Sequence, residues 1–110
     1  LIRNAQGVLI RTPVYNYDAS AATKNLVELT GQAWMNKVVG FLCAAGGSGS
    51  YMSVMSLANS LMLDFRCLVI PRFVYATKEA FTEGRVSDSQ VDDRIQELAE
   101  TLTRLSKAIV

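Results

Sequence analysis

The sequence contains no histidine, and this absence removes the commonest general base and metal ligand from any candidate site. Cysteine is scarce as well, with two residues in the chain. Cys43 and Cys67 lie in apolar stretches and lack the spacing of a metal-binding pair. We therefore expect no metal site, and we interpret both cysteines as buried residues of a protein in a reducing, cytoplasmic compartment. No nucleophile stands beside a base, so we expect no catalytic side chain and assign any reaction to a bound cofactor.

Charge of either sign is also sparse. The net charge of +1 gives no electrostatic reason to expect nucleic acid or a membrane surface as a partner. Residues 38–63 carry no charged side chain, but glycines and serines interrupt this run, so it does not predict a membrane-spanning helix. Residues 1–77 carry six basic and three acidic side chains, and this mildly positive part suits an anionic cofactor.

Alternating patterns of strand and helix predict three βα units in a single domain, residues 1–110. Continuous apolar runs at residues 8–12, 38–44 and 67–70 are typical of strands that are covered on both faces, and the third can continue past Pro71 with a kink. Alternation of this kind indicates an α/β fold with a parallel sheet and right-handed crossovers. Three such strands leave the edge nearest Leu1 unpaired, so we expect one or two further strands to precede it.

The first and last helices are predicted by their ends and their apolar stripes. Asp18 or Ser20 can cap the first helix, Leu26 and Leu29 are expected to face inward, and Gly31 suits its end. The sequence from Ser87 to Gln90 resembles a capping box for the last helix, which we expect to pack on one face of the sheet. Its predicted inward stripe consists of Val91, Ile95, Leu98, Leu102, Leu105 and Ile109.

The middle helix is predicted to begin near Ser50 and to present two contrasting faces. Its predicted buried stripe consists of Tyr51, Val54, Met55, Ala58, Leu61, Met62 and Phe65. The opposite face is polar but uncharged, with Ser53, Ser56, Asn59 and Ser60. One hypothesis is that this face meets a second subunit, which makes the protein a homo-oligomer, and the alternative is a serine-rich face exposed to solvent.

Two loops are expected at the carboxyl edge of the sheet, where open α/β folds bind ligands. The first follows residues 8–12, and there Pro13 stiffens a turn whose backbone groups can bond the edge of a planar heterocycle. The alternative is an ordinary turn with surface tyrosines. The second loop, residues 45–50, is rich in glycine and lets a ligand approach the backbone closely, but it matches neither a P-loop nor G-x-G-x-x-G.

The segment Thr12-Pro13-Val14-Tyr15-Asn16, the later Lys24-Asn25 pair and the Gly46-Gly47-Ser48 loop together resemble the NADPH-dependent FMN reductase family. The resemblance covers roughly residues 1–75 and implies a flavodoxin-like, doubly wound parallel sheet. The family's serine-rich phosphate loop lies after its first strand and has no counterpart in this chain. The chain is therefore similar to the carboxyl-terminal three-fifths of such a reductase, with the first strands absent.

The resemblance also implies a function and a site. It implies an oxidoreductase in which NADPH or NADH passes hydride to bound FMN, which then serves a small-molecule acceptor such as a quinone. The implied cofactor-binding residues are Thr12, Pro13, Val14, Tyr15, Asn16, Gly46, Gly47 and Ser48. Lys24 and Asn25 match a part of the motif that can equally serve to fix the loop.

Three other readings differ in what they require of the chain. A flavodoxin-type electron carrier binds FMN without NAD(P)H activity, although flavodoxins tend to be more acidic than this segment. A receiver-type signalling module needs an aspartate where Thr12 stands, and the sequence therefore argues against it. The third reading, an inactive chain that retains only the fold, is not excluded by the sequence.

Overall fold

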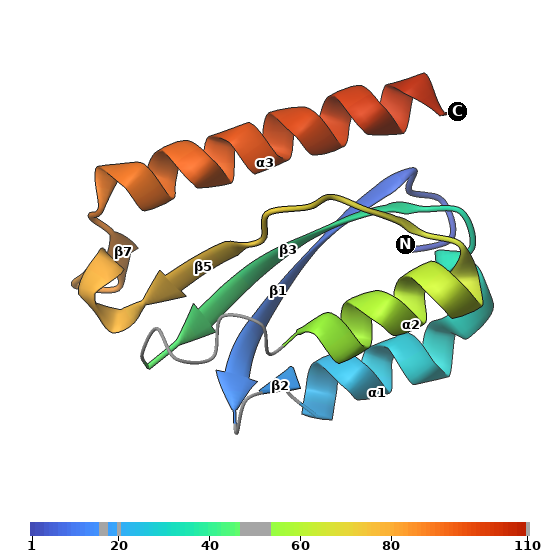
Figure 1. Ribbon diagram of the computed structural model, residues 1–110, viewed down its shortest axis with the longest axis horizontal. Coiled ribbons are helices and arrows are strands. Elements are labelled where there is room, and N and C mark those ends of the chain that lie inside the picture. The colour runs from blue at the N-terminus through green and yellow to red at the C-terminus, as the bar shows by residue number, and fades with distance from the viewer. Residues whose placement is uncertain (16–17, 20, 47–53, 110) are drawn as a thin grey trace.

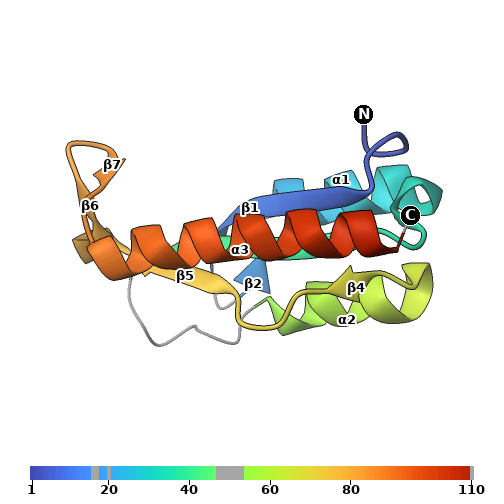
Figure 2. The ribbon, with the colours of Figure 1, turned by 90° about the horizontal axis from the view of Figure 1, so that it is seen from above.

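The computed structural model describes residues 1–15, 18–19, 21–46 and 54–109, with residues 14–15 and 18–19 described by their backbone. A mainly parallel sheet lies between two layers of helices (Figures 1 and 2). Helices α1 (Ala21–Thr30) and α2 (Met55–Phe65) cover one face, and α3 (Ser89–Ala108) covers the other. This arrangement confirms the predicted order of three βα units.

Strand β3 (Val38–Ala45) is the centre of the sheet. It pairs in parallel with β1 (Gly7–Tyr15) on one side, and with β4 (Leu68–Val69) and β5 (Val74–Thr77) on the other. Pro71 lies between β4 and β5, so the third predicted strand does continue past this proline after an interruption. Continuous apolar residues in β3 fit this place, because both of its faces are covered by helices.

The end of β1 differs from the sequence prediction. We expected a strand over residues 8–12 and then a turn, whereas β1 runs on through Pro13 to Tyr15. A short strand, β2 (Asp18–Ala19), then pairs antiparallel with the last two residues of β1. Because the described β2 pairing begins only after Pro13, β1 has one neighbouring strand at this proline, and a residue without an N–H is tolerated there. Asp18 thus lies in β2, and Ser20 lies outside the described residues.

Helix α1 ends at Thr30, as predicted, and the short helix η1 (Gly31–Trp34) follows it directly. The inward face predicted for α1 is wrong, because Leu26 and Leu29 are 50% and 77% exposed. Val27 is buried instead, and the indole Nε1 of Trp34 donates to the Thr30 hydroxyl (2.8 Å). The side of α1 that meets the protein therefore includes threonines, which a search for apolar residues does not find.

Helix α2 begins later than predicted, at Met55 instead of near Ser50. Val54, Ala58 and Leu61 are buried as expected, and Leu57 is buried as well although the predicted stripe omitted it. Met62, which the predicted buried stripe includes, is 38% exposed instead. The described members of the polar face, Ser56, Asn59 and Ser60, are exposed as predicted, whereas Ser50, Tyr51 and Ser53 lie outside the described residues.

Helix α3 packs on the sheet as expected and is capped within the predicted segment, but by Asp88 and not by Ser87, the first residue of the predicted capping box. Asp88 is its cap residue, because its Oδ1 accepts from the N–H groups of Gln90 (2.9 Å) and Val91 (3.3 Å). Val91 and Leu98 are buried, but Ile109 lies beyond the helix and is 49% exposed. Before α3, helix η3 (Lys78–Ala80) and a hairpin of β6 (Phe81–Thr82) and β7 (Arg85–Val86) form a connection that the sequence did not predict.

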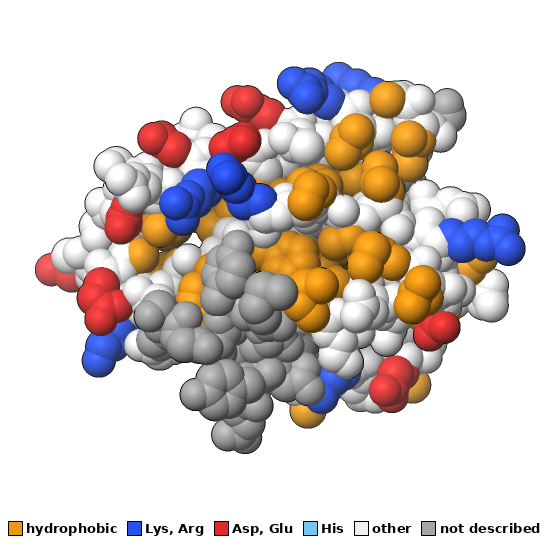
Figure 3. All heavy atoms as spheres, in the orientation of Figure 1, with side chains coloured by type: hydrophobic (Ala, Val, Ile, Leu, Met, Phe, Trp, Pro, Cys, Tyr) orange, Lys and Arg blue, Asp and Glu red, His pale blue; other side chains and the backbone are white. Residues whose placement is uncertain are grey.

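Hydrophobic side chains also reach the surface between α2 and α3, over the β4–β5 edge (Figure 3). Leu68 is 46% exposed there, and an open cavity of about 310 Å³ is lined by Met55, Ala58, Met62, Val69, Pro71, Arg72 and Phe73. Arg72, in the interruption between β4 and β5, has a φ of 65°, which is in the left-handed region. The interruption between β4 and β5 keeps this edge short, and short edge strands resist pairing with other chains.

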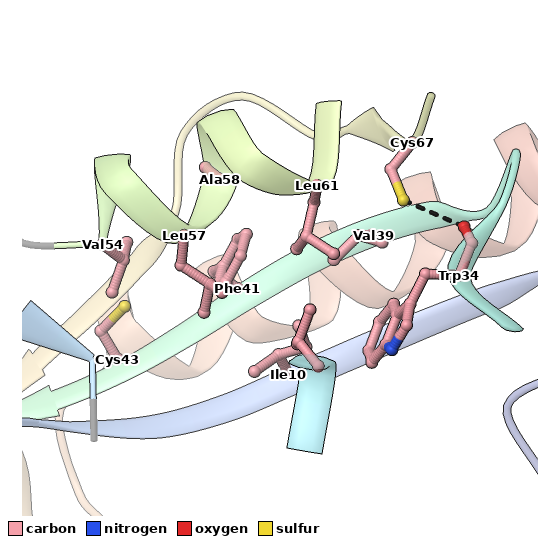
Figure 4. Packing of buried hydrophobic residues seen from close by; sticks show 11 residues of the cluster. Ile10, Trp34, Val39, Phe41, Cys43, Val54, Leu57, Ala58, Leu61 and Cys67 are labelled. Atoms are coloured by element: carbon pink, nitrogen blue, oxygen red, sulfur yellow. Dashed lines mark hydrogen bonds between the residues drawn. The ribbon is translucent and has the colours of Figure 1, made fainter. Parts of the chain in front are cut away.

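The larger core cluster fills the space between the sheet, α1 and α2. Figure 4 shows Phe41 of β3 below Leu57 of α2, with Ile10 of β1 beside them. Both cysteines are buried as predicted, and the Cys67 Sγ donates to the Trp34 carbonyl oxygen (3.1 Å). Burial raises the pKa of the Cys43 thiol to about 11, so this thiol stays protonated and unreactive near neutral pH.

Candidate functional site

The carboxyl ends of β1 and β3 lie side by side at one edge of the sheet (Figure 1). In the parallel register Thr12 is opposite Cys43, and Pro13 is opposite Ala44. The segments that follow these two strands therefore leave the sheet at the same level, as we expected. Residues 12–15 lie at the end of β1, and Gly46 follows β3, whereas Asn16, Gly47 and Ser48 lie outside the described residues.

Thr12 has an unusual environment at this edge. Among residues with described side chains it is the one buried polar residue, with none of its surface exposed. Its hydroxyl donates to the Pro13 carbonyl oxygen (3.0 Å) and accepts from the Thr23 hydroxyl (3.0 Å). Thr23 lies in the first turn of α1, so the pair of threonines joins the end of β1 to the helix that follows it.

Gly46 gives the site its access. The residue is exposed, and a Cβ atom built on it meets no atom of the described residues within 4 Å. The nearby Pro13 is half-buried, so its ring and backbone form part of the surface at this edge. Open space beside one strand end and a stiff residue on the next suit a flat ligand that approaches the backbone, and a flavin ring has that shape.

A third strand, β5, also ends at this edge, and the sequence did not predict a site residue on it. Thr77, the last residue of β5, is opposite Ala45 of β3. The Thr77 hydroxyl donates to Oε2 of Glu79 (2.7 Å), and this hydrogen bond lowers the pKa of the Glu79 carboxyl. Glu79 is therefore ionised at neutral pH. Thr77 was not among the predicted site residues, because the predicted strand was bounded at Ile70 and only its continuation past Pro71 was foreseen.

A cavity of about 260 Å³ lies on the α3 side of this edge, next to the β6–β7 hairpin. One basic residue, Arg11, lines this cavity among mainly apolar residues. The lining residues are Arg11, Leu42, Cys43, Ala44, Val74, Ala76, Phe81, Gly84, Val86 and Ile95. Of the two motif residues on α1, Lys24 is half-buried and Asn25 is exposed. In the described part of the chain, no group of three or more histidine, cysteine or acidic residues could hold a metal ion.

Solved structures resemble this fold over nearly the whole chain. An oxidoreductase from Corynebacterium diphtheriae superposes with a TM-score of 0.80 at 20% identity, over 99% of this chain and 59% of that one. A flavodoxin, WrbA-like protein from Agrobacterium tumefaciens gives a TM-score of 0.76 at 15% identity, over 97% of this chain and 69% of that one. The fold is therefore flavodoxin-like. No helix among the described residues is long and apolar enough to cross a membrane.

Sequence comparisons identify the family. An NAD(P)H-dependent FAD/FMN reductase from Geobacillus thermodenitrificans is 32% identical over 101 residues, which cover 90% of this chain and 55% of that protein. The chain spans little more than half the length of the curated relatives it matches. The profile of the NADPH-dependent FMN reductase family matches residues 1–82. This chain belongs to the NADPH-dependent FMN reductase family.

Proposed function

We propose that the protein is an FMN-dependent NAD(P)H oxidoreductase whose flavin lies at the carboxyl edge of β1 and β3. The observation that carries the proposal is the register of these strands, which brings Pro13 and Ala44 opposite each other in a chain of this family. Residues 1–110 then form one partial domain of the complete reductase. Of the residues that the resemblance implies, we propose that Pro13, Val14, Tyr15, Asn16, Gly46, Gly47 and Ser48 border the flavin, while the fully buried Thr12 directly precedes Pro13 without facing the ligand.

In this proposal the chain binds and orients the cofactor and supplies no acid or base of its own. When bound there, FMN would supply the redox chemistry of hydride transfer from NADPH or NADH and of electron transfer to a small-molecule acceptor. Pro13 and Gly46 hold the two sides of the site through their backbone positions. Because Pro13 fixes its own φ, the backbone at the end of β1 loses little freedom when a ligand binds there.

The test uses the complete gene product, purified and titrated with FMN. We expect a protein that takes up FMN with a changed flavin spectrum and that oxidises NADPH or NADH when flavin is added. A flavin spectrum without NAD(P)H oxidation would instead favour a flavodoxin-type electron carrier. Absence of both effects would contradict the proposal.

We also propose that the protein forms a homo-oligomer through α2. The exposed face of this helix carries Ser56, Asn59 and Ser60, and Leu63 beside them is 81% exposed. The one charged residue of α2, Asp64, is exposed near its end. A surface with so little charge and an exposed leucine suits contact with protein better than contact with water. We expect light scattering of the complete gene product to give at least twice the mass of its own polypeptide, and a monomeric mass would contradict this proposal.

The protein is proposed to act in the cytoplasm. Both cysteines are free and buried, and a reducing compartment suits such thiols.

A further inference from the structure

We propose that Thr12 is a positioning residue, whose hydroxyl, held by Thr23, fixes the part of β1 that borders the flavin. The inference rests on the proposed function, because it assigns FMN to the carboxyl edge of β1 and β3. It concerns a side chain that points into the protein, so Thr12 acts on the ligand through Pro13 and not by touching it.

The two hydrogen bonds form a directed chain. A hydroxyl has a single proton, and the Thr12 hydroxyl donates its proton to the Pro13 carbonyl oxygen (3.0 Å). Towards Thr23 it can therefore only accept, and the Thr23 hydroxyl donates to it (3.0 Å). The direction runs from the first turn of α1, through Thr12, to the backbone of Pro13.

These two hydrogen bonds act on Pro13, which is otherwise positioned by the pairing of β1 with β3. Proline lacks an N–H, so the carbonyl is the one backbone polar group through which Pro13 can be held. Thr12 is fully buried, so water cannot replace its hydroxyl as the donor without a rearrangement of the surrounding residues. Loss of the hydroxyl therefore lets the Pro13 peptide turn, and the end of β1 moves with it.

Thr23 also links the two parts of the family motif, the strand part at residues 12–16 and the helical part at residues 24–25. Thr23 directly precedes Lys24 and Asn25 on α1, while Thr12 directly precedes Pro13 on β1. The threonine pair therefore holds the helical part of the motif against the strand part. An apolar residue at either position could fill the space, but it could not set the direction of the Pro13 carbonyl.

The test compares FMN binding by Thr12→Val and Thr12→Ser in the complete gene product. Valine keeps the shape of threonine and removes the hydroxyl, and we expect the FMN dissociation constant to rise about tenfold, which corresponds to about 1.4 kcal/mol. Visible circular dichroism of the bound flavin should change as well, because it reports the surroundings of the ring. Serine restores the hydroxyl, so Thr12→Ser should bind FMN within about twofold of the wild type.

Thr23→Val provides a second, independent variant. Thr23 is only half-buried, so the protein should fold even if Thr12→Val does not. We expect a several-fold rise in the dissociation constant, and the double variant should bind no more weakly than Thr12→Val alone, because both changes break one chain of bonds.

Thr30→Val is the matched control. Thr30 lies at the opposite end of α1, and its hydroxyl also has two bonds, donating to the Leu26 carbonyl oxygen (2.6 Å) and accepting from Trp34. This change should lower the unfolding midpoint and leave FMN binding unchanged. Wild-type affinity in both Thr12→Val and Thr23→Val would overturn this inference and leave the proposed function standing. Equal weakening of FMN binding by Thr12→Val and Thr12→Ser would do the same. A wild-type protein that does not bind FMN would overturn the proposed function and this inference with it.

Discussion

Replacing Gly46 with tryptophan should weaken FMN binding by about 100-fold or more and leave the fold intact. A side chain at this position has room among the described residues, because none of their atoms lies within 4 Å of a Cβ built there. The backbone at Gly46 is also outside the left-handed region, so a residue other than glycine fits it. The indole then takes the space assigned to the flavin, and a 100-fold loss corresponds to about 2.7 kcal/mol. Equilibrium titration with FMN measures the loss, and thermal unfolding measures the fold.

Two further variants show whether the loss is specific. Gly46→Ala adds one carbon and should change the dissociation constant by only a few-fold. Gln32→Trp adds the same indole at an exposed position of η1, beyond the carboxyl-terminal end of α1, and should leave FMN binding unchanged. Wild-type affinity in Gly46→Trp would show that the flavin does not lie beside this residue.

Replacing Phe41 with alanine should lower the free energy of unfolding by about 3–5 kcal/mol. Phe41 is fully buried in the central strand, and its ring centroid lies 5.0 Å from that of Phe73 in a tilted arrangement. The change removes this aromatic pair and leaves a cavity between β3 and α2, where packing is dense. Chemical denaturation monitored by far-ultraviolet circular dichroism measures the difference.

Leu29→Ala is the control for the core. The sequence pattern predicts Leu29 to face inward, whereas in the structure this side chain is 77% exposed. We expect its replacement to change the free energy of unfolding by no more than about 0.5 kcal/mol. Comparable losses in Leu29→Ala and Phe41→Ala would contradict the orientation of α1 in the structure.

The parts of the fold that the sequence predicts well have strong local signals. Strand β3 is a long apolar run, and α3 combines a capping segment, residues 87–90, with a regular apolar stripe. Both signals act within one element, so no tertiary contact is needed to recognise them. The adjacency of the β1 and β3 ends was also predictable, because consecutive strands of a parallel α/β sheet tend to be neighbours.

The parts that were missed depend on contacts between elements. Strand β2 and the β6–β7 hairpin have strands of two residues each, which is too short for a periodic pattern. The inward side of α1 includes Thr23 and Thr30, whose hydroxyls find partners on other segments, so apolar periodicity pointed to Leu26 and Leu29 instead. The hydrogen bonds of Thr12 could not be inferred from its neighbours in sequence, since its partner Thr23 is eleven positions away.

The most direct test of the account is a crystal structure of the complete gene product with FMN bound. The account predicts that the isoalloxazine ring lies at the carboxyl edge of β1 and β3, against Pro13 on one side and Gly46 on the other. A flavin held elsewhere, for example in the cavity between α2 and the β4–β5 edge, would contradict it.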